Sequence, residues 1–421
     1  MLDIKFIGEN KDLIKQNSAN RLAKVDLDKF FVLDEEWRSL QVKIQDLRSE
    51  RNKTSKTKPT PEIIENMKKV GEEISKLEEK EKELEAELKN ISLAIPNLTH
   101  PEVKVSSDEN DNPILETFGK PTKFDFEPKD HVELAENLDL IDFERGAKVT
   151  GAKFYYLKND LVLLNRALVN YALEIVLRHG FKAMITPDLA KTNVIENLGY
   201  SPRGESSQIY QIANDDLSLI GTSEITLGGY HTEEILDLKN LPLKYVGLSH
   251  CFRTEAGSYS KFSKGIFRVH QFEKLEMFVY AEPEQAEIIH QEMLDIEKEI
   301  FSGLDIPFRV IDHCTADLGT PSYRTFDLEA WLPGKPNAEG GKGDWAEITS
   351  TSNCTDYQSR ALNIKYLTAT GEKKFIYTFN GTAVAVPRAL IAILENYQTE
   401  DGSIKIPEKL RPYLPFKKIS K

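Results

Sequence analysis

The chain has 421 residues, of which 40% are hydrophobic and 29% charged, and its formal net charge is −13. No apolar run approaches the roughly 18 residues that a membrane-spanning helix needs, and the acidic balance argues against a protein that coats DNA over its whole surface. At this length we expect two domains, the larger with ample material for a hydrophobic core.

The composition of the N-terminal segment indicates in which cellular compartment we expect the protein. It carries acidic residues and no continuous apolar core, so it resembles neither a signal peptide nor a transit peptide, and we expect a cytoplasmic protein without a membrane association. Cys251, Cys314 and Cys354 lie far apart and form no C-x-x-C pair, which predicts neither a disulfide framework nor a zinc site.

Two long helices are predicted next. Apolar residues recur at alternating steps of three and four from Phe30 and again from Met67, which is the spacing of a heptad seam. Between the two seams, Thr60 can cap a helix and Pro61 can occupy its first position. We therefore expect an antiparallel coiled-coil hairpin over about residues 27–95, and we expect it to project as an arm, because two helices bury too little surface to form a globular domain.

The turn of this hairpin is basic although the protein is acidic. The mixed charges could simply keep a coiled coil soluble, but a concentrated basic tip favours a phosphate-rich partner. We expect residues 1–103 to form the N-terminal domain that binds nucleic acid. Its candidate phosphate contacts are Arg48, Arg51, Lys53, Lys56 and Lys58.

The stretch IPNLTHPEVKVSSDENDNP after the arm is rich in Pro and Asn, so we expect a linker at residues 104–130 that leads into a second domain of residues 131–421. A helix is predicted over 161–178, and hairpin-like loops join the strand candidates at least as often as helices do. We therefore expect an α+β fold with a mainly antiparallel sheet and flanking helices. The strand candidates are residues 181–187, 241–250, 265–280, 323–333, 344–351 and 374–381.

The strand candidate GIFRVHQFEKLEMF places an unusual number of charges on one face. Because side chains alternate along a strand, one face carries Arg268, His270, Phe272, Lys274 and Glu276. A core does not accept unpaired charges, so this face predicts a cleft for charged ligands. The alternative is an edge strand with solvated ion pairs. With Arg253 and Glu255 in a preceding short strand and no paired nucleophile and base, the pattern favours phosphoryl or nucleotidyl transfer.

A third segment, FNGTAVAVPRALIAILENYQ, places Arg388 at the start of a helix. The helix dipole disfavours a cation there, so we expect an anionic or aromatic partner. Together FRTEAG…GIFRVHQFEKLE, WAEITSTSNCTDYQSR and this segment resemble the signature motifs of class II aminoacyl-tRNA synthetases, and with the two-helix arm the chain resembles the seryl-tRNA synthetase family over nearly its whole length. The resemblance implies a class II catalytic domain in residues 131–421.

The resemblance also implies a site for ATP. Arg253 would hold the α-phosphate, Arg268 would meet the γ-phosphate, and Phe272 and Arg388 would sandwich the purine, with these three arginines as the catalytic residues. Glu347 and Ser350 would bind ATP together with Mg²⁺. The full expected ATP set is Arg253, Thr254, Glu255, Arg268, Val269, Phe272, Glu347, Ile348, Thr349, Ser350 and Arg388.

For L-serine the resemblance implies a pocket of hydroxyl, amide and carboxylate groups, which suits a small zwitterion that carries its own hydroxyl. The expected residues are Thr222, Ser223, Glu224, Arg253, Glu276, Asn380 and Thr382. Taken singly, several of these have ordinary structural alternatives, such as a helix cap for Thr222 or a turn hydroxyl for Thr382.

The implied enzyme is a homodimeric serine–tRNA ligase that forms seryl-adenylate from serine and ATP and then charges tRNA(Ser), and also tRNA(Sec) if the organism has it. Pro187 resembles the class II proline at the dimer interface. Residues 199–212 and 256–264 differ from the commonest bacterial pattern. Two alternatives stay open: a ligase that charges a carrier protein with a small amino acid, and a non-catalytic dimeric scaffold with the same fold.

Overall fold

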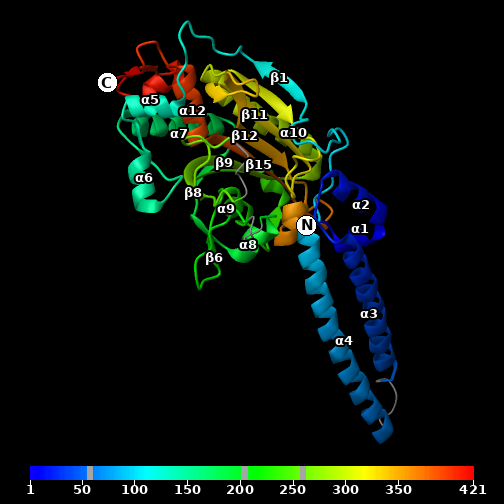
Figure 1. Cartoon of the computed structure of the whole chain (residues 1–421). Coiled ribbons are helices and arrows are strands. Elements are labelled where there is room, and N and C mark those ends of the chain that lie inside the picture. The colour runs from blue at the N-terminus through cyan, green and yellow to red at the C-terminus, as the bar shows by residue number, and fades with distance from the viewer. Residues whose placement is uncertain (55–59, 201–206, 257–261) are drawn as a thin grey trace. The chain divides into compact units, whose positions relative to one another are not determined.

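The computed structural model describes all residues except 55–59, 201–206 and 257–261 (Figure 1). The chain divides into two compact units, Met1–Leu98 and Thr99–Lys421. Lys56 and Lys58, two of the expected basic contacts, lie outside the described residues, as does part of each of the two divergent loops.

The first unit is helical. The side-chain oxygen of Thr60 accepts a hydrogen bond from the backbone N–H of Ile63 at 3.3 Å, and Pro61 occupies the first turn, so the predicted start of the second long helix is confirmed. The helices are α1 (Ile4–Glu9), α2 (Lys11–Asn20), α3 (Leu27–Thr54) and α4 (Pro61–Ala94).

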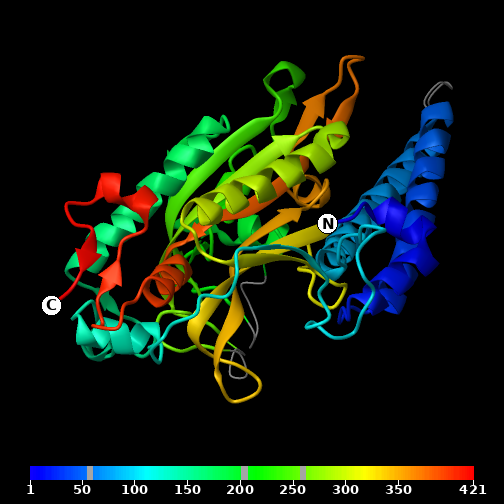
Figure 2. The same cartoon turned by 90° about the horizontal axis from the view of Figure 1, so that it is seen from above.

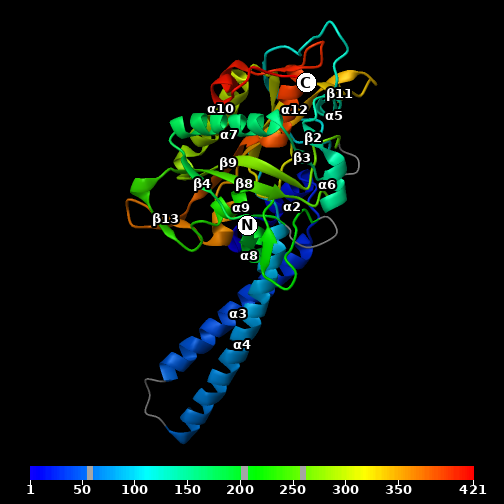
Figure 3. The same cartoon turned by 90° about the vertical axis from the view of Figure 1, so that its left-hand side faces the viewer.

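α3 and α4 lie side by side as the predicted coiled-coil hairpin (Figures 1 and 3). Leu40 and Ile44 of α3 pack with Leu84 of α4 in one buried cluster. Acidic residues of α4 pair with cations of α3, for example Lys43 with Glu73 at 2.9 Å. The charges on these helices therefore serve the pairing of α3 with α4, while the apolar seams supply its core.

The second unit is built on an eight-stranded sheet. All neighbouring strands pair antiparallel except β4 with β8, so the predicted mainly antiparallel sheet is confirmed. Residues 104–130, expected as a linker, contain the edge strand β1, which pairs with β10. The order across the sheet is β1 (Ile114–Phe118), β10 (Phe308–Asp312), β11 (Arg324–Pro336), β12 (Lys342–Asn353), β15 (Tyr377–Ala385), β9 (Gln271–Ala281), β8 (Leu243–Phe252) and β4 (Lys182–Ile185).

Three long helices cover the sheet: α7 (Asp160–Arg178), α10 (Ala286–Gly303) and α12 (Val386–Asn396). Figure 2 shows α7 and α10 running along the sheet. Leu275, Met277 and Val279 of β9 are fully buried in the core that these helices share. Because side chains alternate, Lys274 and Glu276 of the same strand point to the opposite face, as the sequence predicted.

The other elements are short, and they surround the sheet. Among the helices of the described residues, none combines the length and the apolar composition of a membrane span. These elements are α5 (His131–Asn137), α6 (Phe143–Thr150), α8 (Thr192–Asn197), α9 (Glu224–Gly228), α11 (Tyr357–Leu362), β2 (Ile141–Asp142), β3 (Tyr156–Leu157), β5 (Leu189–Lys191), β6 (Leu217–Leu219), β7 (Ile235–Asp237), β13 (Lys365–Leu367), β14 (Lys373–Phe375), β16 (Ile404–Lys405), β17 (Lys418–Ile419) and the 3₁₀ turns Leu238–Asn240, Pro283–Gln285 and Glu408–Tyr413.

Two predictions about strand extent were wrong. The strand expected from Gly265 begins only at Gln271, and β8 ends at Phe252, before Arg253. Gly265 has φ 60°, and a Cβ there would lie 2.2 Å from Nε2 of His131, so the chain turns tightly over a buried side chain instead of extending. Glu255 also has positive φ, 51°, which takes the chain out of the strand conformation.

Candidate functional site

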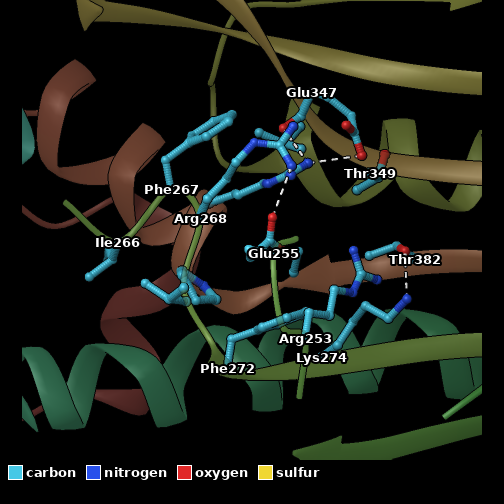
Figure 4. A pocket seen from close by; sticks show the side chains of 15 residues that line it. Arg253, Glu255, Ile266, Phe267, Arg268, Phe272, Lys274, Glu347, Thr349 and Thr382 are labelled. Atoms are coloured by element: carbon cyan, nitrogen blue, oxygen red, sulfur yellow. Dashed lines mark hydrogen bonds and ion pairs between the residues drawn. The ribbon is translucent and has the colours of Figure 1, made fainter. Parts of the chain in front are cut away.

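A cavity that opens to solvent lies beside the ends of β8 and β9, with β12 and the start of α12 on its other sides (Figure 4). Thr254 and Ser350, also expected at the ATP site, are not among its lining residues. The expected residues that line it are Arg253, Glu255, Arg268, Val269, Phe272, Glu347, Ile348, Thr349, Thr382 and Arg388.

The two expected residues outside the lining have other partners. The backbone N–H of Thr254 donates to the carbonyl of Gln208 at 3.1 Å, which ties the end of β8 to the segment after residue 206. Ser350 on β12 lies directly across from Asp327 on β11. The cavity is instead lined by their neighbours in the chain, Arg253 and Glu255 beside Thr254 and Thr349 before Ser350.

Cations of the cavity are held by carboxylates. Nη1 of Arg268 lies 3.3 Å from Oε2 of Glu255, and Nη1 of Arg388 lies 2.8 Å from Oε1 of Glu347. With Arg253, the three arginines line one cavity from different segments. Figure 4 shows Arg253 and Arg268 among the lining side chains. Several partly buried guanidinium groups around one cavity suit a ligand that carries several negative charges.

Aromatic rings lie beside these cations. The guanidinium of Arg388 lies over the ring of Phe267 at 4.7 Å, and that of Arg253 over the ring of Phe272 at 5.3 Å. Phe272 and Arg388, the expected purine sandwich, thus line the same cavity, and their contact with a purine stays a prediction. The sequence reasoning missed Phe267, because a strand from Gly265 would have turned this ring to the opposite face.

Two carboxylate groups, those of Glu347 and Asp327, lie in this part of the site. Burial opposes the ionisation of Glu347, but the charges of Arg388, His313 and Arg253 together lower its pKa. Oδ2 of Asp327 lies 2.9 Å from Nε2 of His313. Within the described part of the chain, no three His, Cys, Asp or Glu side chains are arranged to hold a metal ion by themselves.

A second group of polar residues surrounds Glu224. Its Oε2 accepts a hydrogen bond from the Tyr200 hydroxyl at 2.6 Å, and its Oε1 accepts from Nε2 of Gln358 at 2.8 Å and from Nδ2 of Asn380 at 3.2 Å. Burial and the charge of Glu276 raise the pKa of Glu224, and the hydrogen bonds from Tyr200 and Gln358 oppose this rise. The structure thus brings the expected Glu224, Glu276 and Asn380 together.

The remaining expected residues of this group are also close. The backbone N–H of Glu224 donates to Oγ1 of Thr222 at 3.2 Å, whereas the hydroxyl of Ser223 donates to the carbonyl of Gly247 at 3.2 Å. Oγ1 of Thr382 donates to Oε2 of Glu276 at 3.1 Å. Ser223 is fully buried, and its hydroxyl is directed at β8 and not at Glu224.

Sequence reasoning missed three members of this group: Tyr200, Gln358 and the role of Lys274. Nζ of Lys274 lies 2.6 Å from Oε2 of Glu276, and both side chains are almost fully buried. The alternation in GIFRVHQFEKLEMF was a signal for Lys274, since it shares a face with Glu276. Nothing in the sequence links Gln358 to Glu224, which lies 134 positions away.

Comparisons with known proteins cover both units. A family model for the seryl-tRNA synthetase N-terminal domain matches residues 1–99, and one for the tRNA synthetase class II core domain (G, H, P, S and T) matches residues 208–397. A serine–tRNA ligase of Treponema denticola is 52% identical over 426 residues, which span the whole of both chains. One of Dictyoglomus turgidum is 47% identical and covers 100% of this chain and 99% of its own.

Solved structures give the same result. The seryl-tRNA synthetase of Pyrococcus horikoshii, crystallised with ATP, superposes with a TM-score of 0.91 at 40% identity and covers 100% of this chain and 99% of its own. A cytoplasmic serine–tRNA ligase of Naegleria fowleri in complex with AMP gives a TM-score of 0.87 at 34% identity, with the same coverage.

Proposed function

The chain belongs to the seryl-tRNA synthetase family, and we infer that it is a serine–tRNA ligase whose cavity is the site of amino-acid activation. One observation carries this inference. A cavity lined by three arginines adjoins a polar group that contains two buried carboxylates, Glu224 and Glu276. The first suits the phosphates of ATP and the second the ammonium group of an amino acid.

The chemistry needs no nucleophile from the protein. A carboxylate oxygen of serine attacks the α-phosphorus of ATP, the bond from that phosphorus to the bridging oxygen breaks, and diphosphate leaves. A ribose hydroxyl at the 3′ end of tRNA then attacks the seryl carbonyl, and AMP leaves. Positioned cations favour the first step, because negative charge builds up around the α-phosphorus in its transition state.

We assign the nucleotide groups to the residues of the cavity. Arg253 holds the α-phosphate. Arg268 gives up its ion pair with Glu255 and contacts the γ-phosphate. Arg388 gives up its contacts with Glu347 and Phe267 and stacks on the purine. The ion pairs of Arg268 and Arg388 with carboxylates support this assignment, since both cations line the cavity. Glu255 contributes to binding of the adenine.

Magnesium arrives with ATP in this proposal. Glu347 and Ser350 supply a carboxylate and a hydroxyl, with Asp327 beside Ser350, and these hard oxygen donors fit Mg²⁺. Mg²⁺ commonly keeps few protein ligands and takes the others from phosphates and water. Two contributing residues are therefore sufficient for an ion that the nucleotide carries.

Tyr200 offers a first prediction for the serine pocket. Burial and the charge of Glu224 raise the pKa of its phenol well above the usual value, so it stays protonated and donates to Glu224. Tyr200→Phe should raise KM for serine about five- to tenfold, the effect of losing one hydrogen bond worth about 1–1.4 kcal/mol, and leave KM for ATP unchanged. Tyr230→Phe, at a mostly exposed tyrosine, is the control. Equal changes in both KM values for Tyr200→Phe would contradict the assignment.

The first unit is proposed to bind tRNA(Ser). Arg51 and Lys53 are exposed near the end of α3, whereas Arg48 pairs with Glu78 of α4 at 2.7 Å. The double change Arg51→Glu and Lys53→Glu should weaken tRNA binding about tenfold or more and reduce the slope of log Kd against log salt. Serine-dependent ATP–pyrophosphate exchange should be unaffected. If tRNA affinity and the salt slope were unchanged, the basic residues at the end of α3 would not be tRNA contacts.

We also propose a homodimer. Strand β4 is an edge of the large sheet, and its Ile185 is 88% exposed, an arrangement that favours a protein contact. Pro187 stands two positions after Ile185, where the family resemblance expects the interface. Sedimentation of the full chain tests the dimer. A cytoplasmic location, and charging of tRNA(Sec) where that tRNA exists, stay predictions.

A further inference from the structure

Lys274 lies at the junction of the two halves of the site. Its Nζ lies 2.6 Å from Oε2 of Glu276 and donates to Oγ1 of Thr382 at 3.4 Å. Figure 4 shows its ammonium group and the guanidinium of Arg253 both directed toward Thr382. The side chain of Lys274 is only 7% exposed, so its neighbours hold its ammonium group in one position in the pocket.

A buried ion pair needs an explanation other than stability. Taking both charges out of water costs several kcal/mol, and replacement of such a pair by well-packed apolar residues is often neutral or stabilising. Here Lys274 contacts Glu276 directly, and the charges of both residues act on Glu224. Two neighbouring buried carboxylates disfavour each other's ionised form unless a cation balances them.

We propose that Lys274 is a positioning residue for serine: its ammonium group fixes Glu276 and Thr382 and offsets the negative charge of the neighbouring carboxylates Glu224 and Glu276, which attract the substrate's ammonium group. This inference rests on the proposed function of the site. It assigns to Lys274 an effect on amino-acid binding and none on nucleotide binding.

The surroundings of the pair define a pH readout. Burial and Glu276 raise the pKa of Glu224, and the charge of Lys274 is among the influences that lower it. Without Lys274 this pKa rises further, so Glu224 takes up a proton at a higher pH and loses its attraction for an ammonium group. Among the described residues, the charges of this cluster also interact with Tyr200, Cys251, Arg253 and Glu297.

The experiment is serine-dependent ATP–pyrophosphate exchange by the full chain, with KM for serine and for ATP measured between about pH 6 and pH 8. Lys274→Met should raise KM for serine about ten- to a hundredfold at neutral pH and leave KM for ATP within about twofold. In the variant KM for serine should fall as pH rises, more steeply than in the unchanged protein. Lys274→Gln keeps a hydrogen-bond donor without the charge and should behave in the same way.

Lys244→Met is the matched control. Lys244 is a largely buried lysine on β8 whose Nζ lies 2.6 Å from Glu292, outside the cavity. It should change neither KM value nor the pH profile. An unchanged KM for serine in both Lys274 variants, a parallel rise in KM for ATP, or a failure of both variants to fold would overturn the proposal. Absence of serine-dependent exchange in the unchanged protein would instead overturn the proposed function.

Discussion

Replacement of Arg253 by alanine should lower kcat for serine-dependent ATP–pyrophosphate exchange by about a hundred- to a thousandfold, the effect of removing one preorganised donor from a developing anion. Arg253 lines the cavity, and its Nε donates to the carbonyl of Gly221 at 3.2 Å, so its guanidinium is oriented before any ligand binds. No other cation is assigned to the α-phosphate. Lysine at this position should restore little activity, because it lacks the bidentate geometry of arginine.

Arg309→Ala provides the control for Arg253→Ala. Arg309 on β10 pairs with Glu329 and lies over Trp345, away from the cavity. Its loss should affect stability slightly and exchange hardly at all. Exchange by Arg253→Ala within about threefold of the unchanged protein would contradict the role of Arg253, and it would favour the alternative of a scaffold that does not use its cavity.

Glu276→Gln should cause the second large loss. The change keeps the shape of the side chain but leaves the buried ammonium group of Lys274 without its carboxylate partner at 2.6 Å. In the proposed pocket the change also removes a charged hydrogen-bond acceptor for the ammonium group of serine, worth about 1.5–3 kcal/mol, so KM for serine should rise about ten- to a hundredfold. Breaking the buried pair from one side costs about 3–5 kcal/mol. Part of this cost falls on folding, so the thermal midpoint must be measured beside the kinetics.

Glu292→Gln separates the two effects. Glu292 on α10 pairs with the largely buried Lys244, outside the cavity, so this variant also breaks an ion pair from one side. It should lower the thermal midpoint without changing KM for serine. If Glu276→Gln also changed only the midpoint, Glu276 would be a structural residue and not part of the amino-acid pocket.

The sequence predicted most of the fold because the relevant signals are local. Heptad spacing, a Thr-Pro helix start and strand alternation depend on residues a few positions apart, and α3, α4 and β9 follow them. The extent of β9 was not predictable in the same way. Its late start depends on the close passage of Gly265 over His131, a contact between segments more than a hundred positions apart.

The site shows the same division. The three arginines stand in short motifs, and the structure brings all of them to one cavity. Gln358 stands within the segment WAEITSTSNCTDYQSR, but nothing local connects it to Glu224, and Tyr200 lies in a loop that departs from the common pattern, so their hydrogen bonds to Glu224 emerge only from the folded chain. Lys274 was visible as a charge on the correct face, but its partner Thr382 comes from another strand.

The most direct test of this account is ATP–pyrophosphate exchange by the purified full chain with each of the twenty amino acids in turn. We expect strong exchange with L-serine and far weaker exchange with threonine, alanine and glycine, because each of these lacks the hydroxyl or adds a methyl group. Tested with the same preparation, tRNA(Ser) should accept the seryl group. Exchange that is absent with serine, or that another amino acid supports equally well, would contradict the central claim.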